Sequence, residues 1–112
     1  AIQIASAAEG LAVAERAGLD PVLVAQALTS GQAASPQVMR NVGWMLASPD
    51  VGEVTFTAAL RLKDVSYANE LLRSLRYTSP VGTAVERHFK ELCAMGCSDS
   101  SESRIYDLFR RR

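Results

Sequence analysis

Apolar residues recur along this chain at the three- and four-residue spacing of amphipathic helices. The first seventeen residues are apolar on almost every side but have small side chains, which predicts a helix enclosed by neighbours. Further helical stripes follow at 22–28, 38–46, 56–75, 81–92 and 105–109. No alternating, strand-like pattern persists, so we expect an all-α fold of about six helices in a single domain, residues 1–112.

Turn residues separate these stripes and mark where the helices begin and end. Three starts combine an N-cap residue with a proline in the first turn: Asp20-Pro21, Ser35-Pro36 and Ser79-Pro80. Gly18 suits the left-handed position after the first helix, and Gly96 closes the fifth. Residues 48–52 are the clearest loop, and Asp99 with Glu102 resembles a capping box for the last helix.

A lysine and an aspartate interrupt the apolar stripe of the helix expected over residues 56–72. On a regular helix Lys63 falls within about 20° of Phe56, on the face that also carries Leu60, Tyr67 and Leu71, and Asp64 lies at its edge. Two interpretations remain open. Either both charges are buried beside a site, or the lysine stem lies along apolar surface with its head in water while Asp64 faces solvent.

Composition narrows the classes of function. The chain has 12 basic and 12 acidic residues, 48% hydrophobic residues and no net charge, as in an ordinary soluble domain. Neutrality argues against nucleic acid, because phosphate binding needs a basic excess on one face. The arginines at 110–112 are interpreted as a solvated helix end. Since no run of eighteen apolar residues occurs, no membrane-spanning segment is expected.

Candidate chemistry is sparse in this sequence. Cys93 and Cys97 lie four residues apart with His88 nearby, which is too few ligands for a zinc site, so we expect no metal and two reduced thiols. Reduced thiols favour the cytoplasm or the mitochondrial matrix. His88 lies between apolar positions and is interpreted as a core or rim residue. There is no glycine-rich phosphate loop and no serine, histidine and acid arrangement, so the chain alone is not expected to be an enzyme.

Four stretches carry a resemblance to a known family: Ala-Glu-Gly-Leu-Ala-Val-Ala-Glu-Arg-Ala-Gly-Leu-Asp-Pro at 8–21, Leu-Thr-Ser-Gly at 28–31, Phe56 followed by Leu62-Lys63-Asp64, and Cys-Ala-Met-Gly at 93–96. In order and spacing they resemble the C-terminal helical domain of 3-hydroxyisobutyrate dehydrogenase and its β-hydroxyacid dehydrogenase relatives, which is similar to that of 6-phosphogluconate dehydrogenase. The resemblance covers essentially the whole chain and implies the same helical fold.

The resemblance also implies what this domain does in the family. It closes the cleft over the nicotinamide of NAD or NADP, which is bound by an N-terminal Rossmann domain, in an enzyme acting on small 3-hydroxy acids. Carried over to this sequence, Lys63 contacts cofactor or substrate, Phe56 walls the cofactor site and Asp64 helps to order the active site. The family's catalytic lysine and Rossmann glycines are absent here, so no catalytic residue and no cofactor binding are expected for this chain alone.

Two departures and one alternative accompany this interpretation. Val54-Thr55 stand where the family usually has Pro-Gly, and Ser101 stands where an aspartate is usual. The chain starts as if within a helix, without an initiator methionine, a signal peptide or an N-cap, which suggests a fragment that lacks its N-terminal domain.

The alternative to a dehydrogenase domain is a noncatalytic module that forms homo-oligomers through the small apolar residues of the first helix.

Overall fold

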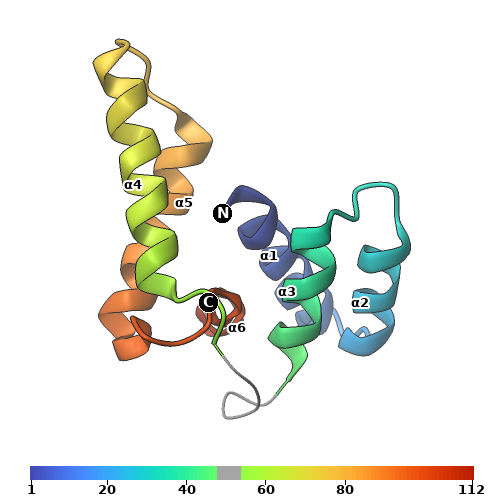
Figure 1. The fold of residues 1–112 in the computed structure, drawn as a ribbon. Helices are drawn as coiled ribbons and strands as arrows, with labels where there is room; N and C mark the ends of the chain where they lie inside the picture. The colour runs from blue at the N-terminus through green and yellow to red at the C-terminus, as the bar shows by residue number, and fades with distance from the viewer. Residues whose placement is uncertain (48–53) are drawn as a thin grey trace.

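The computed structural model describes residues 1–47 and 54–112, in which the chain forms six α-helices (Figure 1). The elements in chain order are α1 (Ile2–Arg16), α2 (Pro21–Ser30), α3 (Pro36–Leu46), α4 (Ala58–Ser74), α5 (Pro80–Leu92), a π-type turn η1 (Cys93–Cys97), a 3-10 turn η2 (Glu102–Arg104) and α6 (Ile105–Arg110). The all-α prediction is confirmed. The loop expected at 48–52 lies outside the described residues.

Side-chain caps begin most of these helices where the sequence predicts. Asp20 Oδ1 accepts a hydrogen bond from the Val22 amide at 2.8 Å, and the Ser35 and Ser79 hydroxyls cap α3 and α5 in the same way. Gly18, after α1, has φ +80°, a backbone conformation that favours glycine. These local signals place the helix boundaries before any tertiary contact is considered.

Helix α1 lies at the centre of the domain, with α2 and α3 on one side and α5 and α6 on the other (Figure 1). Its apolar residues Ile4, Ala8 and Leu11 are at most 1% exposed. They meet Phe89 and Leu92 of α5, both fully buried, and further core residues from α3 and α6. Burying each large apolar side chain contributes about 1.5–3 kcal/mol, so this one cluster is the main source of stability.

The burial of α1 changes the expectation for its surface. The sequence correctly predicts an enclosed helix, but the chain's own helices enclose it. The small apolar residues that suggested pairing with a second copy are therefore mostly occupied: Ala5, Ala7, Ala8 and Ala12 are all buried. Their packing inside the domain removes the observation on which α1-mediated oligomerisation rested.

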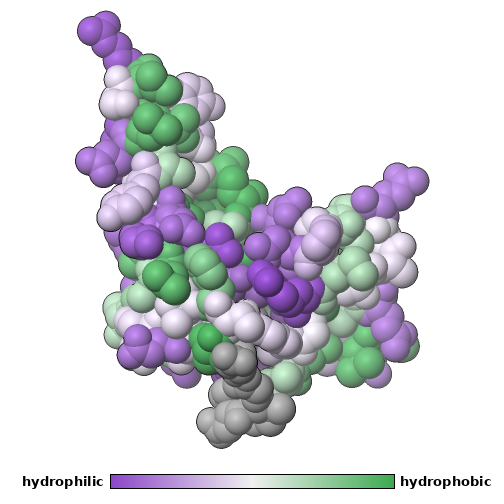
Figure 2. Space-filling view, in the orientation of Figure 1, coloured by the Kyte–Doolittle hydropathy of each residue, from purple (hydrophilic) through white to green (hydrophobic). Residues whose placement is uncertain are grey.

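Helices α4 and α5 form a hairpin that rises beyond the rest of the domain (Figure 1). The two helices approach closely at Gly82, where a Cβ atom would lie 2.4 Å from Asn69 Oδ1 of α4. Large apolar residues at and near the tip remain exposed: Leu71, Leu75, Tyr77 and Val81. Figure 2 shows a green area at the top of the molecule, over the tip of the hairpin. The hairpin tip thus exposes a group of apolar side chains.

The C-terminal arginines are only partly the solvated group expected from the sequence. Arg110 Nη2 donates to Glu15 Oε1 at 2.7 Å, and the Tyr106 hydroxyl donates to the other oxygen at 2.8 Å, so α6 is held to α1. Arg112 pairs with Glu91 of α5. Among the helices described, none combines the length and apolar character needed to cross a membrane.

Candidate functional site

Lys63 lies on the outer face of α4, a face that the rest of the described chain leaves open. Lys63 itself is exposed, and its neighbours along the helix are 42%, 64% and 62% exposed at Leu60, Tyr67 and Leu71. The sequence places these four residues on one side of a helix, and in the structure they do lie on one side of α4. This side is not core, however, because α5 and the C-terminal turns η1 and η2 pack against other sides of α4.

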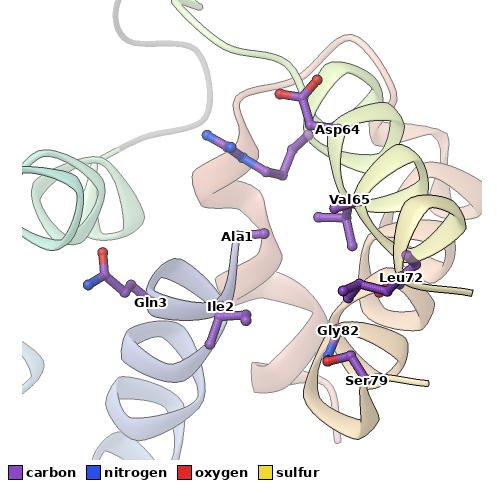
Figure 3. A pocket seen from close by; sticks show the side chains of 11 residues that line it. Ala1, Ile2, Gln3, Asp64, Val65, Leu72, Ser79 and Gly82 are labelled. Atoms are coloured by element: carbon purple, nitrogen blue, oxygen red, sulfur yellow. The ribbon is translucent and has the colours of Figure 1, made fainter. Parts of the chain in front are cut away.

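Asp64 is also exposed and lies on the neighbouring side of α4, toward α1 (Figure 3). There it lines a cavity of about 460 Å³ between the first residues of α1 and the inner side of the α4–α5 hairpin. We call this cavity the α1–α4–α5 cleft; its lining residues are Ala1, Ile2, Gln3, Arg61, Asp64, Val65, Ala68, Asn69, Leu72, Ser79 and Gly82. Lys63 therefore lies on the open outer face of α4, whereas Asp64 lines the adjoining cleft.

Phe56 does not belong to the helix, which corrects the prediction of a continuous helix over 56–72. Thr57 is the N-cap of α4, its hydroxyl accepting from the Leu60 amide at 3.1 Å. The Phe56 ring packs instead against the Arg61 guanidinium, whose central carbon lies 4.3 Å from the ring centroid. Phe56 consequently lies at the foot of α4, and the helical-wheel placement beside Lys63 does not apply to it.

A buried carboxylate, Glu102, holds this end of α4 in place. Its side chain is 2% exposed; Oε2 accepts from Arg61 Nε at 2.5 Å and Oε1 accepts from Asn41 Nδ2 of α3 at 3.3 Å. The Glu102 amide donates to the Phe56 carbonyl at 3.0 Å, so backbone and side chain both join η2 to the start of α4. The predicted capping box of Asp99 and Glu102 is thus wrong, since Ser101 caps the turn and Glu102 points into the core.

A second polar cluster, also missed from the sequence, joins the two helices of the hairpin. Glu86 of α5 accepts hydrogen bonds from Asn69 at 2.7 Å, from Ser66 at 3.1 Å and from Lys90 at 2.7 Å. The Lys90 and Asn69 hydrogen bonds, aided by that from Ser66 and opposed by burial, lower the pKa of Glu86 to about 2. The sequence gives no signal for this cluster, because on the helical wheel Ser66 and Asn69 lie away from the apolar stripe of α4 and only the packing of α5 brings Glu86 to them.

The remaining candidate ligands do not assemble into a site. Cys93 and Cys97 are free thiols, as expected. His88 packs edge-on against the Phe109 ring, with centroids 5.1 Å apart, which supports its interpretation as a rim residue. Burial and the nearby Arg112 charge lower its pKa. Within residues 1–47 and 54–112, no cluster of three or more His, Cys, Asp or Glu side chains could hold a metal ion.

Comparison with known proteins gives two matches. A family model described as NAD-binding of NADP-dependent 3-hydroxyisobutyrate dehydrogenase matches residues 1–109. The chain is also similar to the probable 3-hydroxyisobutyrate dehydrogenase-like 2, mitochondrial, of Arabidopsis thaliana, with 35% identity over 105 residues. That alignment covers 93% of this chain and 33% of the relative, so the chain spans about a third of the relative's length.

Proposed function

The chain belongs to the family of NAD-binding domains of NADP-dependent 3-hydroxyisobutyrate dehydrogenase, and on that premise we propose that it is the C-terminal domain of a longer NAD(P)-dependent 3-hydroxy acid dehydrogenase. In this role it supplies one wall of the substrate pocket and does not catalyse by itself. A Rossmann domain preceding residue 1 would bind most of the dinucleotide. The difference in length between this chain and its relative supports a missing partner domain.

The observation that carries this proposal is the open face of α4. A lysine surrounded by exposed Leu60, Tyr67 and Leu71 is a cation on an uncovered apolar surface, and large exposed apolar patches mark binding surfaces. A nicotinamide dinucleotide presents both flat apolar rings and anionic phosphates, which match these two features. When bound, its nicotinamide ring would supply the hydride chemistry.

The residues of this chain would contact only one side of such a cofactor. Lys63 is available to donate to an anionic or carbonyl oxygen, and Tyr67 offers an aromatic surface one turn further along α4. Phe56 would wall the foot of the helix, where Arg61 holds its ring, and Asp64 would order the adjoining cleft. The phosphate-binding loop has to come from the Rossmann domain.

Lys63→Ala in the longer protein tests this function. Because a hydrogen bond to a charged group contributes about 1.5–3 kcal/mol, we expect the apparent cofactor KM to rise, or kcat/KM to fall, by roughly 10- to 100-fold. Arg73→Ala is the matched control, since Arg73 is an exposed cation on the same helix. Equal effects of the two substitutions in steady-state assays with NAD and with NADP would contradict the role of Lys63.

The same family placement suggests partners and compartment. We propose a small 3-hydroxy acid as substrate and a reducing compartment, cytoplasm or mitochondrial matrix, consistent with the two free thiols and with a relative whose name places it in mitochondria. A homo-oligomer is also proposed. Its contact surface would include the exposed hairpin tip, because α1 is buried within the domain.

The alternative function, a noncatalytic helical association module, rests on that same hairpin tip. Leu75 and Tyr77 are 68% and 58% exposed. Large apolar side chains that are exposed together mark a surface that binds a partner. Both proposals allow association through the hairpin tip, so light scattering on the 112-residue chain tests only whether the tip associates: a monomer at high concentration would contradict the association module. A dimer that dissociates on Leu75→Asp, together with no effect of Lys63→Ala on activity of the longer protein, would favour the association module over the dehydrogenase role.

A further inference from the structure

We propose that the α1–α4–α5 cleft binds a small monocarboxylate, whose carboxylate group is received by the Arg61 guanidinium. The proposal rests on the proposed function for the identity of that ligand as the hydroxy acid substrate. Its physical basis is independent and consists of the position of Arg61, the sharing of Glu102 between Arg61 and Arg40, and the lining of the cleft.

Arg61 is held in one orientation before any ligand arrives. Its Nε donates to Glu102 at 2.5 Å, its guanidinium lies over the Phe56 ring, and its side chain is only 13% exposed. A flexible arginine loses side-chain entropy when it binds an anion, and a fixed one has already lost it on folding. The arrangement is therefore that of a preorganised receptor.

Arg61 also retains hydrogen-bonding capacity. In the described part of the chain, its recorded hydrogen bond uses Nε, which leaves the two Nη groups for another acceptor. These two groups form the forked edge that binds a carboxylate through two parallel hydrogen bonds. Since Arg61 lines the cleft, that acceptor can come from a ligand within it.

Glu102 is shared by two cations, so it does not belong to Arg61 alone. Two guanidinium groups face the one carboxylate: Arg61 at 2.5 Å and Arg40 of α3 at 3.8 Å. Arg40 is 47% exposed and its charge is screened by water, whereas Arg61 is enclosed. With Asp64, which also lines the cleft, the side-chain charges there balance overall, so the case for a carboxylate rests on the Nη groups of Arg61 and not on a net positive charge.

The remaining lining defines the size and charge of the ligand. Val65, Ala68 and Leu72 of α4 give an apolar wall, and about 460 Å³ accommodates a small branched acid. Asp64 lines the same cleft, so it disfavours a second negative charge and can accept a hydrogen bond from a ligand hydroxyl. We therefore expect preference for a monocarboxylate over phosphate or a dicarboxylate.

The test uses the isotopically labelled 112-residue chain, titrated by NMR with isobutyrate and with isobutyramide, its uncharged counterpart of the same shape. We expect saturable shifts of the Arg61 Nε–H and of the Val65 and Ala68 amides with isobutyrate. Isobutyramide should bind at least about tenfold more weakly, because it lacks the charge-assisted pair. Equal responses to both compounds, or no saturable response to isobutyrate, would overturn the proposal.

Two variants keep the result interpretable. Arg61→Met alone would leave the Glu102 carboxylate buried without its closest partner, so the charges are removed together in R61M/E102Q. This double variant should keep the far-UV circular dichroism of the parent and bind isobutyrate at least about tenfold more weakly. Arg73→Met, on the exposed side of the same helix, should bind it unchanged. Unchanged binding by the folded double variant would refute the assignment of Arg61.

Failure of this proposal is distinguishable from failure of the proposed function. In the longer protein, R61M/E102Q should raise the KM for the hydroxy acid by a larger factor than the cofactor KM, whereas Lys63→Ala should raise the cofactor KM by the larger factor. An effect of Lys63→Ala without isobutyrate binding would overturn only the carboxylate site. Isobutyrate binding without any effect of Lys63→Ala would overturn only the dehydrogenase role of Lys63.

Discussion

Two buried carboxylates, Glu86 and Glu102, show how single residues connect elements of this fold. Glu86 is surrounded by donors from both helices of the hairpin, and Glu102 by donors from α3 and α4. Each carboxylate is satisfied by charged and amide groups together, which is the condition under which a buried charge is tolerated. Asn41 Oδ1 is the exception, a buried oxygen without a hydrogen-bond partner among the described residues.

The low pKa of Glu86 makes a prediction about acid stability. Its folded pKa of about 2 lies below the ordinary value of 4.5, so its contribution to the free energy of unfolding is fully present above pH 4.5 and is lost as pH falls toward 2. Glu86→Gln should destabilise the domain at neutral pH by about 1–3 kcal/mol, and this difference should shrink on acidification.

Urea denaturation at a series of pH values measures that difference. Glu70→Gln serves as the control, because Glu70 is an exposed carboxylate on α4. A difference between wild type and Glu86→Gln that stays constant from neutral to acidic pH would show that the carboxylate charge contributes nothing to the hairpin.

At the scale of elements, glycines inside helices have opposite environments. Gly10 lies in the middle of α1 and, beyond its own helix backbone, no atom of the described residues lies within 4 Å of the position a Cβ would take, whereas Gly82 in α5 faces Asn69 Oδ1 at 2.4 Å from that position. Gly10 lowers the helix propensity of α1, and no packing contact in this domain requires a glycine there. Gly82 permits the contact between α4 and α5.

These environments predict effects of opposite sign for the same substitution. Gly10→Ala should stabilise the chain by up to about 1 kcal/mol, because alanine is the better helix former. Gly82→Ala should destabilise it by about 1–3 kcal/mol, because Asn69 would have to leave its hydrogen bond with Glu86. Thermal or urea unfolding of both variants measures the two effects, and a destabilising Gly10→Ala would contradict the open environment of Gly10.

At the scale of the whole molecule, the domain has a rigid centre and a projecting hairpin. Helix α1 is buried against four other helices, while the far ends of α4 and α5 contact mainly each other and expose Leu71, Leu75 and Tyr77. Local stability follows the density of buried apolar contacts. The surfaces proposed to meet the cofactor and a partner therefore lie on the less stable part of the domain.

Native-state hydrogen exchange tests this distribution. Amides in the middle of α1, such as those of Ala8 and Leu11, should exchange only through global unfolding, whereas amides of residues 71–82 should exchange through local opening with a smaller free energy. Equal protection along α1 and the hairpin tip would contradict it. In the longer protein, protection of the tip should increase if other parts of the molecule cover it.

The sequence by itself determined the helices, most of their ends and the family resemblance of this protein. Helix periodicity, N-caps such as Asp20 and Ser79, and Gly18 act within a few residues, so they can be identified without knowing the fold. Only the tertiary structure decided that the Lys63 face is open, that Phe56 lies outside α4 and that Glu102 is buried on Arg61. Residues 61 and 102 are 41 positions apart, and such a pairing depends on how the helices pack rather than on any local pattern.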